Sequence, residues 1–425
     1  MLKFDLPYGK GQMKINVPKD RVAGVLVSKA HHFKPEGTEE EIVRKALENP
    51  IESKSLRELV RGKENVVIIS SDHTRPVPSH VTMPILLEEI RTGNPNAKIS
   101  ILVATGMHRP TTKEELINKY GEEIANNENI IIHDSCDEAS LVKIGTLPSG
   151  GELIINKHAV EADLLISEGF IEPHFFAGFS GGRKSVLPGI ASKATILANH
   201  CSEFVGSNKA RTGKLEGNPI HKDMLYAAEK ANLAFILNVV IDADKKIIAA
   251  FSGNREKAHY TGCEFVKDLA GVDAVKADIA ITTNGGYPLD QNMYQTVKGL
   301  TAAEATLKEK GVIIMASECS DGHGGQEFYE TFKNARSVKD VMNEITSRGR
   351  KETISDQWES QVLSRVLLKY KVILVTSAPK EMIEDMHMAV APSVEKAIEM
   401  ADEYLGNKNG KITVIPDGVS VVVRG

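Results

Sequence analysis

Short runs of β-branched and apolar residues alternate along the chain with longer segments in which apolar residues recur at helical spacing. Such runs predict buried strands, and the segments between them predict helices that pack on the sheet. In the first half we expect strands near Glu64–Ser71, Lys98–Ala104, Asn129–His133 and Asp163–Ser167. We expect helices at Ser79–Arg91, Thr112–Tyr120 and Gly151–Val160. This alternation is typical of a doubly wound α/β domain with a mainly parallel sheet.

A second series of strands and helices follows a hairpin and a long helix. We expect the hairpin from Leu233–Ile241 and Lys246–Phe251, and the long helix over Asn254–Leu269. Later strands are predicted at Asp278–Thr283, Val312–Ala316 and Lys371–Thr376, with helices at Ala302–Glu309 and Val394–Leu405. We therefore predict two Rossmann-like α/β domains, a larger one over residues 1–270 and a smaller one over 272–405. Two strands within residues 410–425 either return to the first domain or edge the second.

Composition narrows the function classes. The chain has 425 residues, of which 41% are hydrophobic and 26% charged, too apolar for a disordered protein. The net charge of -5 argues against a nucleic-acid partner. The N-terminus resembles a hairpin around Gly9–Gly11 instead of a signal peptide, and no apolar stretch approaches the ~20 residues that span a bilayer. We expect a cytoplasmic protein without a membrane partner, and four scattered cysteines that form no disulfide framework or thiolate zinc site.

Polar residues follow three of the predicted strands at their carboxyl ends, where ligands bind in doubly wound sheets. They are Asp72, His73, Thr74 and Arg75 after the first strand, His108 and Arg109 after the second, and Glu168, Glu172 and His174 after the fourth. In the second domain a turn-rich loop from Asn284 to Gly299 follows the first strand. Because both sets lie at strand ends, we predict an active site in the cleft between the domains.

Each of these residues also has a purely structural interpretation. Asp72 and Arg75 suit a helix cap and a surface ion pair. His108 and His174 suit hydrogen-bonded loop histidines, but both sit on proline-flanked turns just past strand ends, which favours a function. His323, in a glycine-rich segment, stays open between the two interpretations.

The strongest local signal is the segment Gly178–Gly189, which contains Gly181, Gly182, Arg183, Lys184 and Pro188. Glycines followed by Arg and Lys suit an anion site, a plain turn, or a lysine open to covalent attachment. Arg183 separates Gly182 from Lys184, so the register of a Walker P-loop is absent. No segment supplies a dinucleotide fingerprint either. Further along, a predicted helix over Lys193–Phe204 carries His200, and a metal there would need ligands from elsewhere.

In these segments the chain resembles the nickel-dependent lactate racemase family of 2-hydroxyacid racemases. The resemblance extends over essentially the whole chain. It rests on Ser71–Pro76, Thr105–Arg109, Glu172–Gly178, Gly181–Ser185, Asn199-His200 and Tyr294–Gly299. It implies a two-domain enzyme that holds a nickel-pincer nucleotide, Ni(II)-pyridinium-3,5-bisthiocarboxylate mononucleotide, made by separate cofactor-biosynthesis proteins.

The resemblance also implies roles for individual residues. Lys184 corresponds to the covalent tether of the cofactor and His200 to the protein's nickel ligand, which completes the four-coordinate planar site that Ni(II) favours. His108 and His174 correspond to the acid/base pair. Cofactor contacts are implied for Asp72, His73, Thr74, Arg75, Gly181, Gly182, Pro188, Lys184 and His200. Substrate contacts are implied for Arg75, Tyr294, Gln295, Lys298 and Trp358, although Trp358 equally suits a buried position on a helix over Ile354–Tyr370.

Elementary chemistry agrees with this assignment. Hydride loss from C2 of lactate leaves the stable ketone pyruvate, whereas proton loss there leaves a poorly stabilised carbanion. A neutral histidine can take the hydroxyl proton at neutral pH, and two enantiomers call for two bases. Three alternatives stay open: another 2-hydroxy acid such as malate, a nucleotide-dependent phosphotransferase, and a solute-binding protein without turnover.

Overall fold

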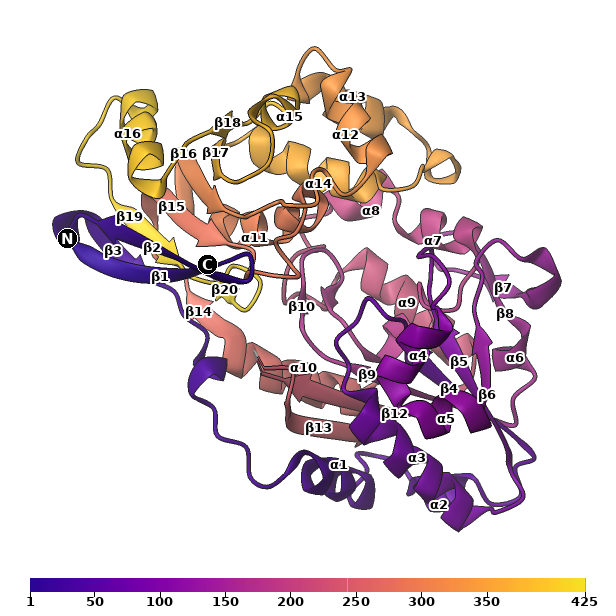
Figure 1. Ribbon diagram of the computed structural model, residues 1–425. Helices are drawn as coiled ribbons and strands as arrows, with labels where there is room; N and C mark the ends of the chain where they lie inside the picture. The colour runs from indigo at the N-terminus through magenta and orange to yellow at the C-terminus, as the bar shows by residue number, and fades with distance from the viewer. Residues whose placement is uncertain (243, 425) are drawn as a thin grey trace. The chain divides into compact units, whose positions relative to one another are not determined.

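The computed structural model describes residues 1–242 and 244–424, which fold into two compact units (Figure 1). We call Ala30–His200 together with Lys209–Asp268 the N-terminal unit. The C-terminal unit comprises Met1–Lys29, Cys201–Asn208 and Leu269–Gly425, of which Gly425 lies outside the described residues. Each unit is built on its own six-stranded sheet.

The sheet of the N-terminal unit has the strand order β13-β12-β9-β4-β5-β6. Its strands are β4 (Asn65–Ser71), β5 (Lys98–Ala104), β6 (Asn129–Ile132), β9 (Leu164–Phe170), β12 (Leu233–Ile241) and β13 (Ile247–Gly253). All neighbouring pairs are parallel except β12 with β13, which form the predicted hairpin. Two small ribbons accompany the sheet: β7 (Leu141–Thr146) with β8 (Glu152–Asn156), and β10 (Pro173–His174) with β11 (Gly178–Phe179).

Helices cover both faces of this sheet because its central strands are apolar on both sides. Val66 and Ile68 of β4 share one core with α1 and α3, while Val67 and Ile69 are buried on the opposite face. The helices of the unit are α1 (Glu39–Glu48), α2 (Leu56–Leu59), α3 (Ser79–Gly93), α4 (Lys113–Tyr120), α5 (Glu122–Asn127), α6 (Lys157–Val160), α7 (Lys193–Asn199), α9 (Pro219–Lys230) and α10 (Lys257–Ala270).

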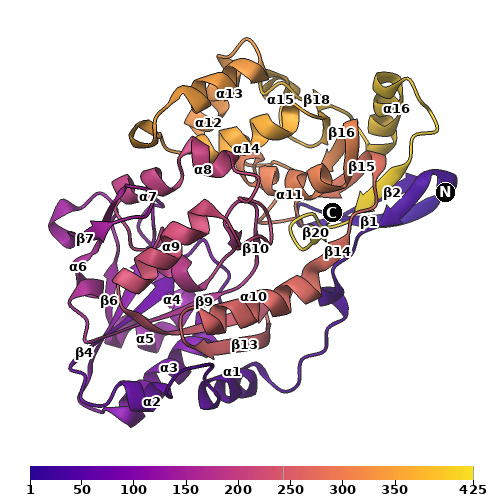
Figure 2. The same ribbon diagram turned by 180° about the vertical axis from the view of Figure 1, so that it is seen from behind.

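The sheet of the C-terminal unit is entirely parallel, with the order β18-β17-β16-β15-β19-β3. Its strands are β3 (Val22–Val25), β15 (Ala277–Thr283), β16 (Leu307–Ala316), β17 (Lys371–Val375), β18 (Ala389–Val390) and β19 (Ile412–Ile415). Its helices are α8 (Ser202–Gly206), α11 (Met293–Thr306), α12 (Gln326–Lys333), α13 (Val338–Ser347), α14 (Gln357–Leu367), α15 (Lys380–Asp385) and α16 (Val394–Leu405). Within this unit α14 lies beside α8 and α11 (Figure 2). The predicted mainly parallel α/β architecture is confirmed.

The start of the chain differs from the sequence-based division, which assigned residues 1–270 to one domain. The antiparallel hairpin of β1 (Leu2–Tyr8) and β2 (Gly11–Val17) buries Leu6, Ile15 and Val17 in the core of the C-terminal sheet. The strand β3 then pairs with β19. The last strand, β20 (Val422–Arg424), pairs with β14 (Gly271–Asp273), so both ends of the chain join the C-terminal unit.

Four local predictions were wrong. The helix predicted over Ala302–Glu309 is instead the last part of α11 and the start of β16. Residues 151–160 form β8 and the short α6 instead of one helix, and Leu153 and Ile155 are buried on the same face of β8, two residues apart. The loop predicted up to Gly299 ends earlier, since the Asn292 side chain caps α11, which begins at Met293. The helix predicted over Lys193–Phe204 ends at Asn199, so His200 is a C-cap residue.

None of the helices in the described part of the chain is long and apolar enough to cross a membrane.

Candidate active site

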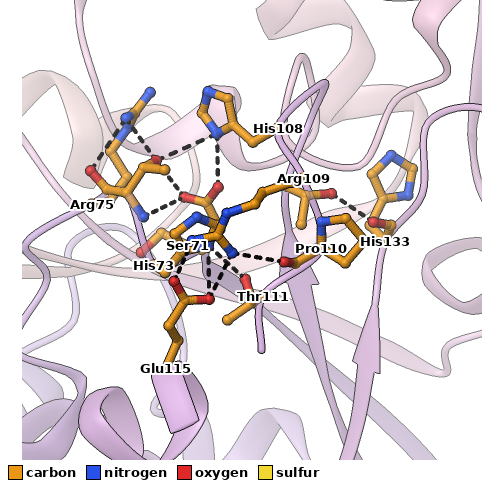
Figure 3. A network of polar contacts seen from close by, with 12 residues as sticks. Ser71, His73, Arg75, His108, Arg109, Pro110, Thr111, Glu115 and His133 are labelled. Carbon is orange, nitrogen blue, oxygen red and sulfur yellow. Dashed lines mark hydrogen bonds and ion pairs between the residues drawn. The ribbon is translucent and has the colours of Figure 1, made fainter. Parts of the chain in front are cut away.

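Asp72 and His108 form a hydrogen-bonded pair at the carboxyl ends of two neighbouring strands. Asp72 directly follows β4, and His108 lies on the turn after β5, closed by its backbone N–H donating to Thr105 at 2.9 Å. Because β4 and β5 are parallel and in register up to Ala104, the two residues meet. The His108 Nδ1 atom is 2.7 Å from Asp72 Oδ2 (Figure 3). The structure thus brings together two residues that the sequence placed on separate loops.

The pair fixes the orientation of the imidazole. Asp72 is 1% exposed, whereas the His108 side chain is 45% exposed. Burial alone would raise the pKa of Asp72, but the hydrogen bond and charge of His108, with help from Thr74, outweigh it and lower that pKa. An ionised carboxylate accepts the Nδ1 proton, so the Nε2 atom of neutral His108 carries the lone pair that a general base needs. Asp72 is not a helix cap, since α3 begins after Pro78.

The residues next to the Asp72–His108 pair lie on two sides of it. Thr74 donates its hydroxyl to Asp72 at 2.6 Å, and Arg75 donates to the Thr74 hydroxyl at 2.9 Å. His73 faces the other way, with its Nδ1 atom 3.0 Å from the Thr111 hydroxyl. Figure 3 shows Arg75 and His108 on one side of the network and Glu115 on the other. Arg75 is therefore placed beside His108, whereas the cofactor contact implied for His73 remains a prediction.

A buried polar network surrounds the end of β4, directly before Asp72, and Glu168, which was predicted to follow the fourth strand, lies within β9 in this network. Glu168, 2% exposed, accepts hydrogen bonds from the hydroxyls of Ser70, Ser79 and Thr82. Lys119 of α4 donates to the Ser71 hydroxyl at 3.1 Å, and burial lowers the pKa of its ammonium group against the opposing charges of Glu168 and Asp72. Lys119 occupies an ordinary position in an amphipathic helical pattern, which is why pattern analysis assigned it no role.

His174 is held differently from His108. It ends β10, and its Nδ1 atom accepts backbone N–H groups of Phe176 at 3.5 Å and Ala177 at 3.2 Å. Its ring stacks on Phe175 and meets the Phe176 ring edge-on at 4.6 Å between centroids. Because Nδ1 accepts, the proton of the neutral ring sits on Nε2. The two predicted acid/base histidines therefore present opposite tautomers.

Lys184 and His200 lie around the same phenylalanine as His174. The Lys184 Nζ atom is 5.9 Å from the centroid of the Phe176 ring, and the His200 ring meets that ring edge-on at 5.3 Å. The charge of Lys184 also acts on His200. Three residues that the sequence placed on three separate segments thus gather in one place.

The state of His200 suits a metal ligand. Burial, with the charge of Lys184, lowers its pKa to about 3, although a hydrogen bond to Ile196 opposes the shift. Its Nδ1–H donates to the Ile196 carbonyl at 3.0 Å, which puts the ring proton on Nδ1 and the lone pair on Nε2, the arrangement of a histidine that binds a metal through Nε2. Within the described residues no group of three or more His, Cys, Asp or Glu side chains is arranged to hold a metal ion. A metal at His200 would therefore need donors from a bound cofactor.

Backbone N–H groups of the glycine-rich segment donate hydrogen bonds to other groups of the protein. The Gly182 N–H donates to Asn238 at 2.7 Å and the Lys184 N–H to Gly181 at 3.1 Å. Gly181 and Gly182 have φ of +73° and +52°, and a Cβ on Gly182 would lie 2.6 Å from the His259 ring. These contacts shape a tight turn that carries Lys184. Contacts of Gly181, Gly182 and Pro188 with a cofactor remain predictions.

Arg183 anchors this turn from inside. It is 1% exposed and donates to the carbonyls of Ala177 at 2.7 Å and Phe179 at 2.8 Å. Its Nε donates to His221 Nδ1 at 3.0 Å, and burial lowers the pKa of the guanidinium to about 10. Arg183 therefore points into the unit and organises the backbone beside Lys184, a role that the sequence did not reveal.

Acid should destabilise the protein through His221. Burial, with the charge of Arg183, lowers its pKa to about 3, whereas an unfolded histidine titrates near ~6.5. Between these values the unfolded chain binds the extra proton, so stability present above pH 6.5 is lost as the pH falls towards 3. We expect His221→Asn to flatten the slope of the unfolding free energy by up to about 1.4 kcal/mol per pH unit, measured by urea denaturation. An unchanged slope would contradict this, and the exposed His80→Asn serves as control.

The C-terminal unit gathers the remaining predicted residues at the start of two helices. In α11 the Tyr294 hydroxyl donates to Asp356 at 2.9 Å, and Lys298 donates to the Gln295 side-chain oxygen at 2.6 Å. Trp358, half-buried in the first turn of α14, donates a hydrogen bond to Tyr294. The structure thus brings Tyr294, Gln295, Lys298 and Trp358 together within this unit, and Trp358 lies half-buried on a helix, whereas its contact with substrate remains a prediction.

The chain has two α/β units with mainly parallel sheets, a hydrogen-bonded pair of ionised Asp72 and His108, and His174 in the opposite tautomer. These features are typical of an enzyme that transfers protons. Family comparison assigns this enzyme to the isomerases, as a racemase. Residues 8–213 match the model of the lactate racemase N-terminal domain, and residues 272–423 match that of the lactate racemase C-terminal domain. The chain belongs to the lactate racemase family.

Individual relatives agree over the full length. The chain is 59% identical to a lactate racemase of Thermoanaerobacterium thermosaccharolyticum and 57% identical to one of Lactiplantibacillus plantarum, covering 100% of each. The solved lactate racemase apoprotein of T. thermosaccharolyticum superimposes with a TM-score of 0.97 at 58% identity over 100% of both chains. A Thermotoga maritima protein, 21% identical, shares the fold with a TM-score of 0.66 over 92% of this chain. The term apoprotein indicates that the first of these structures belongs to a cofactor-dependent enzyme.

Proposed function

We propose that the protein interconverts L- and D-lactate with a nickel-pincer nucleotide tethered to Lys184. The observation that carries this proposal is the gathering of Lys184, His200 and His174 around Phe176, with His200 kept neutral and its Nδ1 proton directed to Ile196. When bound, the cofactor supplies a carbon that accepts a hydride from lactate and returns it to pyruvate. The family relationship at 57–59% identity supports lactate as the substrate.

The residues present fit such a cofactor. The Lys184 amine and the buried neutral imidazole of His200 both lie beside the Phe176 ring. One protein ligand is enough for the metal when the cofactor brings three donors of its own. The other proposed contacts of the cofactor are Asp72, His73, Thr74, Gly181, Gly182 and Pro188. Arg75 lies beside His108 and binds the substrate carboxylate through two N–H donors of its planar guanidinium group. Substrate contacts are also proposed for Tyr294, Gln295, Lys298 and Trp358.

His108 and His174 serve opposite enantiomers. The Nε2 atom of His108 takes the hydroxyl proton of one enantiomer, and the charge that develops on the ring is stabilised by Asp72. His174, with its proton on Nε2, donates to the oxygen of pyruvate as the other enantiomer forms. His108 then releases the proton it gained and His174 regains one from solvent, so both rings are neutral again before the next turnover. Pyruvate turns between the two bases so that hydride returns to its other face.

Intact-mass and nickel analysis tests the proposal on protein made in cells that carry the cofactor pathway. We expect one adduct of several hundred daltons and about one nickel per chain in the wild type, and neither in Lys184→Ala. Lactate racemisation should disappear with them. The matched control is Lys193→Ala, an exposed lysine on the first turn of α7 that should keep adduct, nickel and activity. Wild-type protein without an adduct under these conditions would refute the mechanism.

The alternatives make different predictions. A racemase of malate or another 2-hydroxy acid would retain adduct and nickel but prefer that substrate when pure enantiomers are compared. A phosphotransferase would bind nucleotide and Mg²⁺ without nickel, and the internal use of the Gly182 and Lys184 N–H groups disfavours it. Cytoplasmic location and supply of the cofactor by separate biosynthetic proteins belong to the same proposal.

A further inference from the structure

The C-terminal unit holds a buried carboxyl group that the proposed chemistry does not use. Glu359 follows Trp358 in the first turn of α14 and is 1% exposed. Its Oε1 atom has no hydrogen-bond partner among the described residues. An ionised carboxylate in this position would lack the partners that buried charges require. The group therefore needs either a proton or a cation.

Lys298 is the cation that acts on Glu359. Burial raises the pKa of Glu359 to about 8, and the charge of Lys298 holds that pKa down, while the charge of Asp356 raises it. Glu359 in turn acts on Tyr294, whose pKa lies well above its ordinary value, mainly through burial. Lys298 and Tyr294 lie on α11, which packs against α14. Glu359 thus shares its surroundings with two residues of the proposed substrate site.

Other charged groups near α14 form ion pairs with one another. They form the pairs Arg365–Glu304 between α14 and α11, Arg350–Glu203 at α8, Arg348–Glu344 at α13 and Lys333–Asp385 at α12. None of these groups contributes to the pKa shift of Glu359, whose causes are burial, Lys298 and Asp356. Lys298 is therefore the cation that decides the state of Glu359.

We propose that Glu359 is a positioning residue that competes with the anionic substrate for the Lys298 ammonium group. In its neutral form Glu359 leaves the charge of Lys298 to the substrate. In its ionised form it neutralises Lys298, and a carboxylate ligand then enters a site of lower positive charge. The inference rests on the proposed function, in which Lys298 contacts the substrate.

The competition predicts the direction in which substrate affinity changes with pH. A substrate that binds only when Glu359 is neutral binds more weakly as the pH rises through the pKa of that group. One pH unit above a pKa of about 8, the apparent KM for lactate is expected to be about tenfold higher than at pH 7. Glu359→Gln, which is permanently neutral, should keep a flat KM profile over the same range.

The steady-state experiment compares KM and kcat for lactate between pH 6.5 and 9 in cofactor-loaded wild type, Glu359→Gln and Glu327→Gln. Glu327 is an exposed carboxylate on α12 and serves as the matched control. We expect the KM rise in wild type and Glu327→Gln and its absence in Glu359→Gln, with kcat changed less than KM. A merely structural role would lower kcat or stability without flattening the KM profile. A wild-type KM that stays constant up to pH 9 overturns the inference while leaving the racemase function intact.

A second measurement does not depend on turnover. Infrared difference spectra between wild type and Glu359→Gln report the protonated carboxyl band of Glu359 in the full-length protein without substrate. We expect the band at pH 6.5, its loss on titration above pH 8, and its persistence to higher pH in Lys298→Met. A carboxyl already ionised at pH 6.5, or a titration unmoved by Lys298→Met, overturns the inference. If this titration is found but no lactate is racemised, the proposed function fails and the Glu359–Lys298 coupling stands.

Discussion

His108→Asn is expected to lower the rate of lactate racemisation by about 10²–10⁴-fold, the usual contribution of one general acid–base group. The reason lies in the geometry of the Asp72 pair. Asp72 fixes the proton on Nδ1 of His108, so the solvent-facing Nε2 atom is the proton acceptor. Asparagine keeps a polar side chain there but has no group that titrates near neutral pH. The measurement is the racemisation rate from each pure enantiomer with cofactor-loaded enzyme.

The variant should also separate the two enantiomers. Rapid-quench measurement of pyruvate formed on the enzyme should show that His108→Asn loses pyruvate formation from one enantiomer and retains it from the other. His174→Asn should retain pyruvate formation from the enantiomer that His108 serves but lose its conversion to the other enantiomer. His80→Asn, at an exposed position in the first turn of α3, provides the control and should keep both half-reactions. Equal loss of both half-reactions in His108→Asn would contradict the assignment of one base to each enantiomer.

Asp72→Asn is expected to lower kcat by a similar factor, roughly 10²–10⁴-fold, although Asp72 itself is 1% exposed. The asparagine amide can donate to His108 Nδ1, which moves the ring proton to Nε2 and removes the lone pair from the reacting side. It also withdraws the negative charge that stabilises the protonated ring. The measurement is kcat for lactate together with the adduct mass and the nickel content.

Nickel content distinguishes this role from the cofactor contact that the sequence implied for Asp72. If Asp72 acts through His108, the adduct and nickel remain in Asp72→Asn while kcat falls. The double variant with His108→Asn should then be little slower than the slower single variant, because residues that act as a unit are not additive. Loss of nickel in Asp72→Asn, or additive losses in the double variant, would instead indicate that Asp72 holds the cofactor.

Much of the fold could be predicted because the apolar runs of the central strands are unambiguous. β4, β5 and β12 lie where the pattern placed them, since strands buried on both faces are apolar at nearly every position. Residues 151–160 show the limit of the method. A short run with alternating burial fits either a strand or a helical turn, and only its pairing with β7 decides.

The candidate site was predictable where its residues follow strand ends or belong to family segments. His108, His174, Lys184 and His200 lie in such places, and the structure gathers the last three around Phe176. The supporting residues could not be predicted from sequence. Lys119 and Glu359 are charged side chains in ordinary helical patterns, and only burial among distant segments reveals that they carry constrained charges.

The pairing of β3 with β19 has a consequence for the synthesis of the protein. Val22 leaves the ribosome 390 residues before its partner Ile412. At about 5–20 residues per second, the N-terminal segment waits roughly 20–80 s for the strand beside which it belongs. During that time the apolar side chains of Leu6, Ile15 and Val17 have no completed core to enter. The N-terminal unit can fold while the chain is still growing, but the sheet of the C-terminal unit is completed only after Ile412 has been synthesised.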